Sequence, residues 1–249
     1  MRFAGGSDKG KTRTSNQDEF AVLNDREGNF LAIVCDGVGG GNHGEIASHM
    51  TVSCMKQKFE DNEGFKDLED AQAWLFTSIK QTNQTVYMRG ITDSEYAGMG
   101  TTLVAFLKTK HGSLMANVGD SRGYALGVDD VFRAVTVDHS YVAKLVQTGQ
   151  ISIQEAMVHP QRHVITNAIG IWDDITIDFY PIGKDVKSIL LCSDGLHDYV
   201  SERLIGAIMR EQTFSPEEKV KRLIDAANLA GGYDNVTLVV AEGLEADHE

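Results

Sequence analysis

Short apolar runs bounded by turn residues are the feature that most constrains what this chain can fold into. They are Phe30–Cys35, Thr101–Leu107, Ser113–Val118, Arg122–Leu126, Val131–Val137, Thr176–Tyr180, Ser188–Cys192 and Asn235–Val240. Runs of this length that end in Gly, Asp or Asn predict β-strands. The runs between Thr101 and Val137 are joined by short turns. This favours antiparallel pairing, because a parallel crossover needs a dozen or more residues.

Longer segments with helical periodicity lie between these runs. Glu45–Phe59 and Asp67–Met88 each place their apolar residues on one face. A third helix is expected to begin at Ser215-Pro216, where Glu218 completes a capping box, and to end at Gly231. Strands with helices interposed in pairs predict an α+β fold, in which two sheets pack together and the helices lie outside.

We expect a single domain, residues 1–249, because the chain has no repeat and only 3 prolines. The net charge of -13 argues against nucleic acid and anionic membranes as partners, since both carry negative phosphates. The odd number of cysteines, without a CxxC spacing, argues against a disulfide framework, and we expect Cys35 and Cys192 to be buried. No apolar run reaches membrane-spanning length, so we expect a cytoplasmic protein.

Aspartates at the ends of several runs are the candidate functional residues. Asp36, Asp120 and Asp194 follow apolar runs, Asp234 precedes one, and Asp18 ends a polar stretch. A single Asp-Gly pair is ordinary turn chemistry. If the run ends converge, however, the carboxylates repel one another and require a counter-ion. Oxygen ligands without Cys or His indicate magnesium, manganese or calcium rather than zinc.

Two glycine-rich motifs suggest nucleotide binding, but their context disfavours it. Residues 5–12 fit the P-loop pattern GxxxxGKT, yet we expect neither a buried strand before them nor a helix after them. Residues 39–44 fit GxGxxG, but Asp36 would face the pyrophosphate with no positive charge nearby. A cysteine phosphatase is also disfavoured, because no cysteine has an arginine six residues further on.

A series of short motifs in a fixed order extends over nearly the whole chain. The motifs are Gly10–Asp18, Cys35–Gly40, Gly44–Ser48, Gly98–Thr102, Val118–Arg122, Asp138–Ser140, Thr166–Gly170, Leu191–Leu196 and Gly232–Thr237. In this order they resemble the metal-dependent protein phosphatases of type 2C, in their short bacterial form. The resemblance implies a four-layer α-β-β-α sandwich, two central antiparallel sheets flanked by pairs of helices, with a metal site at one edge of the sheets.

The same resemblance implies a set of metal ligands and cofactors. The ligands are Asp18, Asp36, Gly37, Asp120, Asp194 and Asp234. Asp36 would bridge two Mn²⁺ or Mg²⁺ ions, with Gly37 binding through its carbonyl oxygen. Asp194 and Asp234 would hold one ion, and Asp18 would act through metal-bound water. Asp120, together with Asp194, matches the position linked to a third ion.

The implied activity is hydrolysis of phosphoserine and phosphothreonine on proteins by a metal-activated hydroxide, without a phospho-enzyme intermediate. Its catalytic residues would be Arg13, Asp36 and Asp194, with Arg13 clamping the phosphate as a bidentate fork. Mammalian relatives carry a histidine where Val38 stands, and many bacterial relatives carry one where Gly41 stands. Metal-bound water and His43 therefore remain alternatives for protonating the leaving serine oxygen.

Residues 140–163 match a flap that influences substrate access in the family, although they also fit a plain helix pair, Tyr141–Thr148 and Ser152–Met157. The expected partner is a phosphoprotein substrate of a serine/threonine kinase, and we expect a monomer. Two alternatives share the fold. A pseudo-enzyme predicts lost metal aspartates, and none is lost here. A phosphatase of the anti-sigma-regulator type usually lacks the arginine found here as Arg13.

Overall fold

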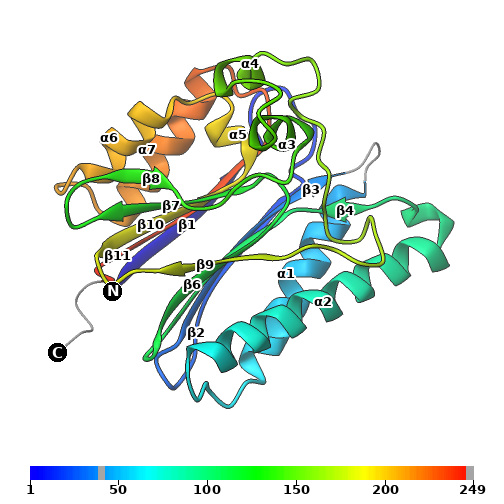
Figure 1. The fold of residues 1–249 in the computed structure, drawn as a ribbon, viewed down its shortest axis with the longest axis horizontal. Coiled ribbons are helices and arrows are strands. Elements are labelled where there is room, and N and C mark those ends of the chain that lie inside the picture. The colour runs from blue at the N-terminus through cyan, green and yellow to red at the C-terminus, as the bar shows by residue number, and fades with distance from the viewer. Residues whose placement is uncertain (39–42, 245–249) are drawn as a thin grey trace.

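Two antiparallel β-sheets packed face to face form the centre of the molecule in the computed structural model, which describes residues 1–38 and 43–244 (Figure 1). The first sheet has the order β1 (Arg2–Asp8), β11 (Val236–Glu242), β10 (Val186–Cys192), β7 (Arg122–Gly127) and β8 (Phe132–Ala134). The second has the order β2 (Asp18–Asn24), β3 (Phe30–Val38), β5 (Leu103–Thr109), β6 (Gly112–Val118) and β9 (Asp178–Ile182). The short strand β4 (Gly100–Thr101) pairs with the end of β3.

Helices cover the outer face of each sheet (Figure 1). Helices α1 (Gly44–Glu60) and α2 (Leu68–Thr92) pack on the second sheet, and α6 (Glu202–Arg210) and α7 (Pro216–Leu229) pack on the first. The shorter helices are η1 (Ser94–Tyr96), α3 (Tyr141–Gln147), α4 (Ile153–Met157) and α5 (Asp194–His197). The four-layer sandwich predicted from the sequence is confirmed. Among the described residues, no helix combines the length and the apolar content that a membrane crossing requires.

Three apolar clusters hold the four layers together. One lies between α1, α2 and the second sheet and includes Leu75 and Ile79; another lies between α6, α7 and the first sheet and includes Leu223. The third lies between the two sheets and includes Phe30 and Phe106. The central strands of each sheet, such as β3, β5 and β10, therefore present apolar side chains on both faces. This is why the sequence shows continuous apolar runs there instead of alternation.

The two strands at one side of the sandwich, β1 and β2, were not predicted. β1 contains Gly5 and Gly6 and is half-buried or exposed along its length, and the apolar stretch of β2, Phe20–Leu23, is short and only half buried. The glycines are needed for close packing, since a Cβ at Gly5 would lie 2.3 Å from the Phe20 ring and one at Gly6 would lie 2.7 Å from Val220. The P-loop interpretation, which the sequence context disfavours, is wrong. Residues 5–8 lie within the strand β1 instead of a phosphate-binding loop, and no helix directly follows residue 12.

Some predicted boundaries also differ from the structure. β8 spans only Phe132–Ala134 instead of Val131–Val137, because it pairs with β7 over three residues. Asp36 lies within β3 and not after it, because pairing with β2 and β4 continues the strand to Val38. The nine-residue helix α6 was not predicted at all. Residues 39–42, which belong to the second sequence motif and the GxGxxG pattern, lie outside the described residues.

Candidate metal centre

A cavity of about 520 Å³ opens at the end of the sandwich near α5. Four of the predicted aspartates line it together with two other predicted site residues: Asp36, Asp120, Asp194 and Asp234, with Arg13 and Gly37. Asp18 is not part of the lining and lies deeper, 8% exposed. The structure therefore brings residues from five distant stretches of the chain to one place.

Strand pairing explains this convergence. Asp18 and Asp36 are direct cross-strand partners on β2 and β3. Asp194 follows β10, and Asp234 stands two residues before β11; because these neighbouring strands are antiparallel, the end of one meets the start of the other. Asp120 comes two residues after the last residue of β6 in the second sheet. Face-to-face packing of the two sheets then places both groups around one cavity.

Asp234 pairs with Arg13, but no lysine or arginine among the described residues forms an ion pair with Asp18, Asp36, Asp120 or Asp194. Burial, together with the nearby charges of Asp194 and Asp234, raises the pKa of Asp18 to about 7. Burial, reinforced by neighbouring carboxylates, also raises the pKa of Asp36 and Asp120 well above the usual range and raises that of Asp194. Groups of this kind are stable as anions only when a cation lies among them.

Asp18 shows the need for a cation most directly. Its Oδ2 accepts a 2.7 Å hydrogen bond from the Ser193 hydroxyl, whereas its Oδ1 is buried and has no hydrogen-bond partner among the described residues. An unpaired buried carboxylate oxygen is costly. The oxygen-rich donor set therefore fits a hard divalent cation such as Mg²⁺ or Mn²⁺.

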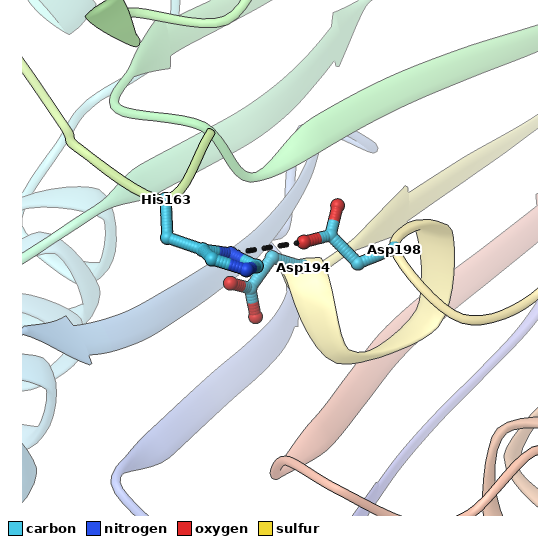
Figure 2. A group of neighbouring side chains, drawn as sticks. All are labelled: His163, Asp194 and Asp198. Carbon is cyan, nitrogen blue, oxygen red and sulfur yellow. Dashed lines mark ion pairs between the residues drawn. The ribbon is translucent and has the colours of Figure 1, made fainter. Parts of the chain in front are cut away.

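A tighter group of possible ligands includes two residues that the sequence analysis did not identify. The side chains of His163, Asp194 and Asp198 offer ligand atoms that all lie within 4.8 Å of one another (Figure 2). Within the described ranges no other three such side chains meet this criterion, so the four predicted lining aspartates are more widely spaced. His163 Nδ1 lies 3.3 Å from Asp198 Oδ2. Asp198 stands four residues after Asp194, a helical spacing that could have revealed it.

Gly37 occupies a position where no side chain fits. A Cβ there would lie 2.4 Å from the Gly44 backbone at the start of α1 and 2.6 Å from the Gln17 carbonyl oxygen. The Gly37 amide donates to that Gln17 oxygen at 3.0 Å, and the Ser48 hydroxyl of α1 donates to it at 2.7 Å. The absence of a side chain thus lets three chain segments meet directly behind the cavity.

Arg13 lies at the edge of the cavity on a loop that is fixed from the opposite end of the sequence. Its Nη2 donates to Asp234 Oδ2 at 2.7 Å. The Asn235 side chain donates to the carbonyl oxygens of Lys9 and Ser15 and accepts from the Gln17 amide, all within 3.0 Å. The loop that carries Arg13 is therefore attached to the turn that carries Asp234.

Two histidines near the motifs form local contacts. His197 Nε2 lies 3.0 Å from the Asp120 carbonyl oxygen, and His139 Nδ1 accepts from the Gly119 amide at 3.2 Å. Both therefore fix the turn that carries Asp120. His43 does not line the cavity; its ring packs against Tyr96 with centroids 5.3 Å apart.

Comparison with known proteins connects this geometry to a family. Residues 6–230 match the profile of the family described as Protein phosphatase 2C. The Serine/threonine phosphatase stp of Listeria innocua is 35% identical over 238 residues, which cover 95% of this chain and 93% of that protein. Protein phosphatase PhpP of Streptococcus pneumoniae is 34% identical over 245 residues, 98% of each.

Solved structures show the same similarity. The serine/threonine phosphatase Stp1 from Staphylococcus aureus superposes with a TM-score of 0.89 at 33% identity, covering 96% of this chain and 94% of that one. The Mycobacterium tuberculosis serine/threonine phosphatase PstP/Ppp gives a TM-score of 0.83 at 35% identity, with 97% of each chain covered.

Proposed function

This chain belongs to the protein phosphatase 2C family and is a metal-dependent protein serine/threonine phosphatase, and we propose that the aspartate-lined cavity is its catalytic centre. The observation that carries this assignment is the convergence of buried and half-buried, mutually repelling aspartates with Arg13 at their edge. The substrates would be phosphoserine and phosphothreonine side chains of proteins, hydrolysed without a phospho-enzyme intermediate.

The donor set favours two Mn²⁺ or Mg²⁺ ions. We propose that Asp36, the Gly37 carbonyl oxygen, Asp194 and Asp234 hold them and that Asp18 supports them from below. Asp120 and Asp194 would hold a third ion, with His163 and Asp198 close enough to take part. When bound, the ions would lower the pKa of the attacking water and neutralise charge on the phosphoryl oxygens.

The role of Arg13 follows from its contacts. One of its terminal nitrogens bonds to Asp234, and its remaining donors have no other hydrogen-bond partner among the described residues. A guanidinium held at one end presents a preorganised fork to phosphoryl oxygens, which is the geometry that stabilises developing negative charge. His43 does not line the cavity. We therefore propose that water donates the proton that the leaving serine oxygen takes up.

The segment at residues 140–163 is our candidate for the flap of a single domain, residues 1–249. Its two ends are joined by the bridge between Ser140 and Ile165, and His163 connects its end to Asp198 beside the cavity. Figure 1 shows α3 and α4 at the end of the sandwich that carries α5. A segment attached in this way can narrow access to the cavity. We further propose a cytoplasmic monomer that opposes a serine/threonine kinase.

The experiment that tests this function measures hydrolysis of a phosphothreonine peptide with Mn²⁺ and with EDTA. Wild-type protein should be active with Mn²⁺ and inactive with EDTA. Asp194→Ala should lower kcat/KM by at least about 100-fold, because it removes a proposed ligand and not merely its support. Asp225→Ala, an exposed aspartate on α7, is the matched control and should retain full activity. Wild-type inactivity with Mn²⁺, or activity that survives EDTA, would reject the proposal.

A further inference from the structure

The walls of the catalytic cavity differ in chemical character. Aspartates and Arg13 form one side. An apolar wall forms another, and it consists of Val38, Ile165, Ala168, Ile171 and Trp172. Trp172 is 41% exposed although it is the largest apolar side chain at the cavity. An aromatic ring left open beside a reactive site is a common form of binding anchor.

The loop that carries Trp172 is held rigidly by a buried amide. Asn83 of α2 is 1% exposed, and its Nδ2 donates to the carbonyl oxygens of Trp172 and Asp173 at 3.0 Å. Its Oδ1 accepts from the Gly170 amide at 2.8 Å. A single buried side chain thus fixes the backbone on both sides of Ile171. Fully satisfied buried polar groups of this kind specify one conformation.

Two further contacts fix the same loop. Lys80, one turn before Asn83 on α2, donates to the Ile175 carbonyl oxygen. Gly170 has a φ of +84°, and a Cβ there would lie 2.5 Å from Val86 of the same helix. The loop is therefore pressed against α2 along its whole length. The backbone that carries Trp172 is thus fixed before a substrate binds, so little backbone conformational entropy is lost when a ligand binds.

The division of the cavity determines where parts of a phosphopeptide would bind. The phosphoryl group belongs on the side of the aspartates and Arg13. Consecutive Cα atoms along a peptide are only about 3.8 Å apart, so a side chain next to the phosphorylated residue comes within reach of the apolar residues that line the same cavity. Apart from the indole N–H of Trp172, Ile171 and Trp172 offer no hydrogen-bonding side-chain atom there. Burying an apolar group there is favourable, whereas burying an unpaired polar group is costly.

We infer that Ile171 and Trp172 form a substrate subsite for an apolar side chain adjoining the phosphorylated serine or threonine. This inference rests on the proposed catalytic centre and adds a sequence preference to it. The alternative occupant of this subsite is a basic side chain of the peptide. Asp173 is exposed beside Trp172, so a cation could stack on the Trp172 ring and pair with the Asp173 carboxylate. The apolar side chains that line the cavity beside Trp172 favour the apolar occupant.

The test compares phosphothreonine peptides that differ only in the residue next to phosphothreonine: leucine, alanine or arginine, on either side. With Mn²⁺, wild-type kcat/KM should be about tenfold higher for leucine than for alanine in at least one position, the effect of a few methylenes in an apolar pocket. Trp172→Gln should reduce this ratio to about twofold or less. Trp172→Leu, which keeps an apolar side chain of similar size, should retain most of it.

A matched pair of controls lies on α2. Phe76 is 46% exposed and does not line the cavity, so Phe76→Gln and Phe76→Leu should both keep the wild-type ratio. Equal wild-type rates for leucine and alanine, a preference for arginine, or equal ratios in Trp172→Gln and Trp172→Leu would each overturn the inference. These results would leave the phosphatase assignment intact. Failure to hydrolyse any peptide with Mn²⁺ would instead reject the catalytic centre itself.

Discussion

Replacing Asp18 with asparagine should stabilise the metal-free protein at neutral pH. Asp18 is buried, and its pKa is raised to about 7 by that burial and by Asp194 and Asp234. Asparagine has nearly the same shape and can still accept the Ser193 hydrogen bond. Its amide would stand where the Asp18 Oδ1 has no partner, so the substitution removes a charge without removing a contact.

The magnitude follows from the two pKa values. An unfolded aspartate has a pKa of about 3.9. Between about pH 4 and 7 the folded protein keeps a proton that the unfolded chain has released, so the free energy of unfolding falls as pH rises through this window. The full loss is about 4 kcal/mol, of which about 2 to 3 kcal/mol falls between pH 5 and pH 8. For a chain of this size that corresponds to about 5–10 °C in Tm.

The assay is thermal unfolding in EDTA at pH 5, 6, 7 and 8, followed by circular dichroism. The Tm of wild-type protein should fall more steeply with pH than that of Asp18→Asn, and Mn²⁺ should raise the wild-type Tm more than that of the variant. Asp225→Asn on the exposed face of α7 should behave as wild type. Equal pH dependence in wild type and Asp18→Asn would refute the reasoning that Asp18 is ionised at the expense of stability.

Two further substitutions test the positions of Arg13 and of the Trp172 loop. Arg13→Lys should lower kcat/KM for a phosphothreonine peptide by about tenfold or more, because lysine keeps the charge but cannot bond Asp234 and present a fork at once; an unchanged value would show that Arg13 does not contact the phosphate. Asn83→Ala should destabilise the protein by about 2–4 kcal/mol in urea unfolding, since it removes three hydrogen bonds and leaves the Gly170 amide unpaired. A change below about 0.5 kcal/mol would contradict the conclusion that Asn83 holds the Trp172 loop in place.

Several features could be predicted from neighbouring residues alone. The capping box at the start of α7 is present, with Ser215 and Glu218 bonded reciprocally. The continuous apolar runs at β3, β5 and β10 are buried strands, and Cys35 and Cys192 are buried and free. These predictions succeed because capping, turn formation and strand formation depend on residues close together in the chain.

The strands β1 and β2 and the group formed by His163, Asp194 and Asp198 could not be predicted from neighbouring residues. Among the described residues β1 pairs with β11 alone, which comes from the other end of the chain, and the close contacts of its glycines with Phe20 and Val220 explain why a larger residue does not fit. His163 and Asp198 are separated by 35 residues in sequence, and only the tertiary placement of residues 140–163 brings them together. Local propensity carries no information about such contacts.

The sequence by itself determined the chemistry: acidic side chains beside glycine or asparagine at the ends of apolar runs, an arginine near the start, and the order of motifs that marks the family. Only the tertiary structure decided how that chemistry is arranged. Pairing of β2 with β3 and of β10 with β11, and the packing of the two sheets, place the carboxylates around one cavity. The physical reason is that the charge of each aspartate is local, whereas its burial, its neighbours and the apolar residues in the same cavity are set by long-range packing.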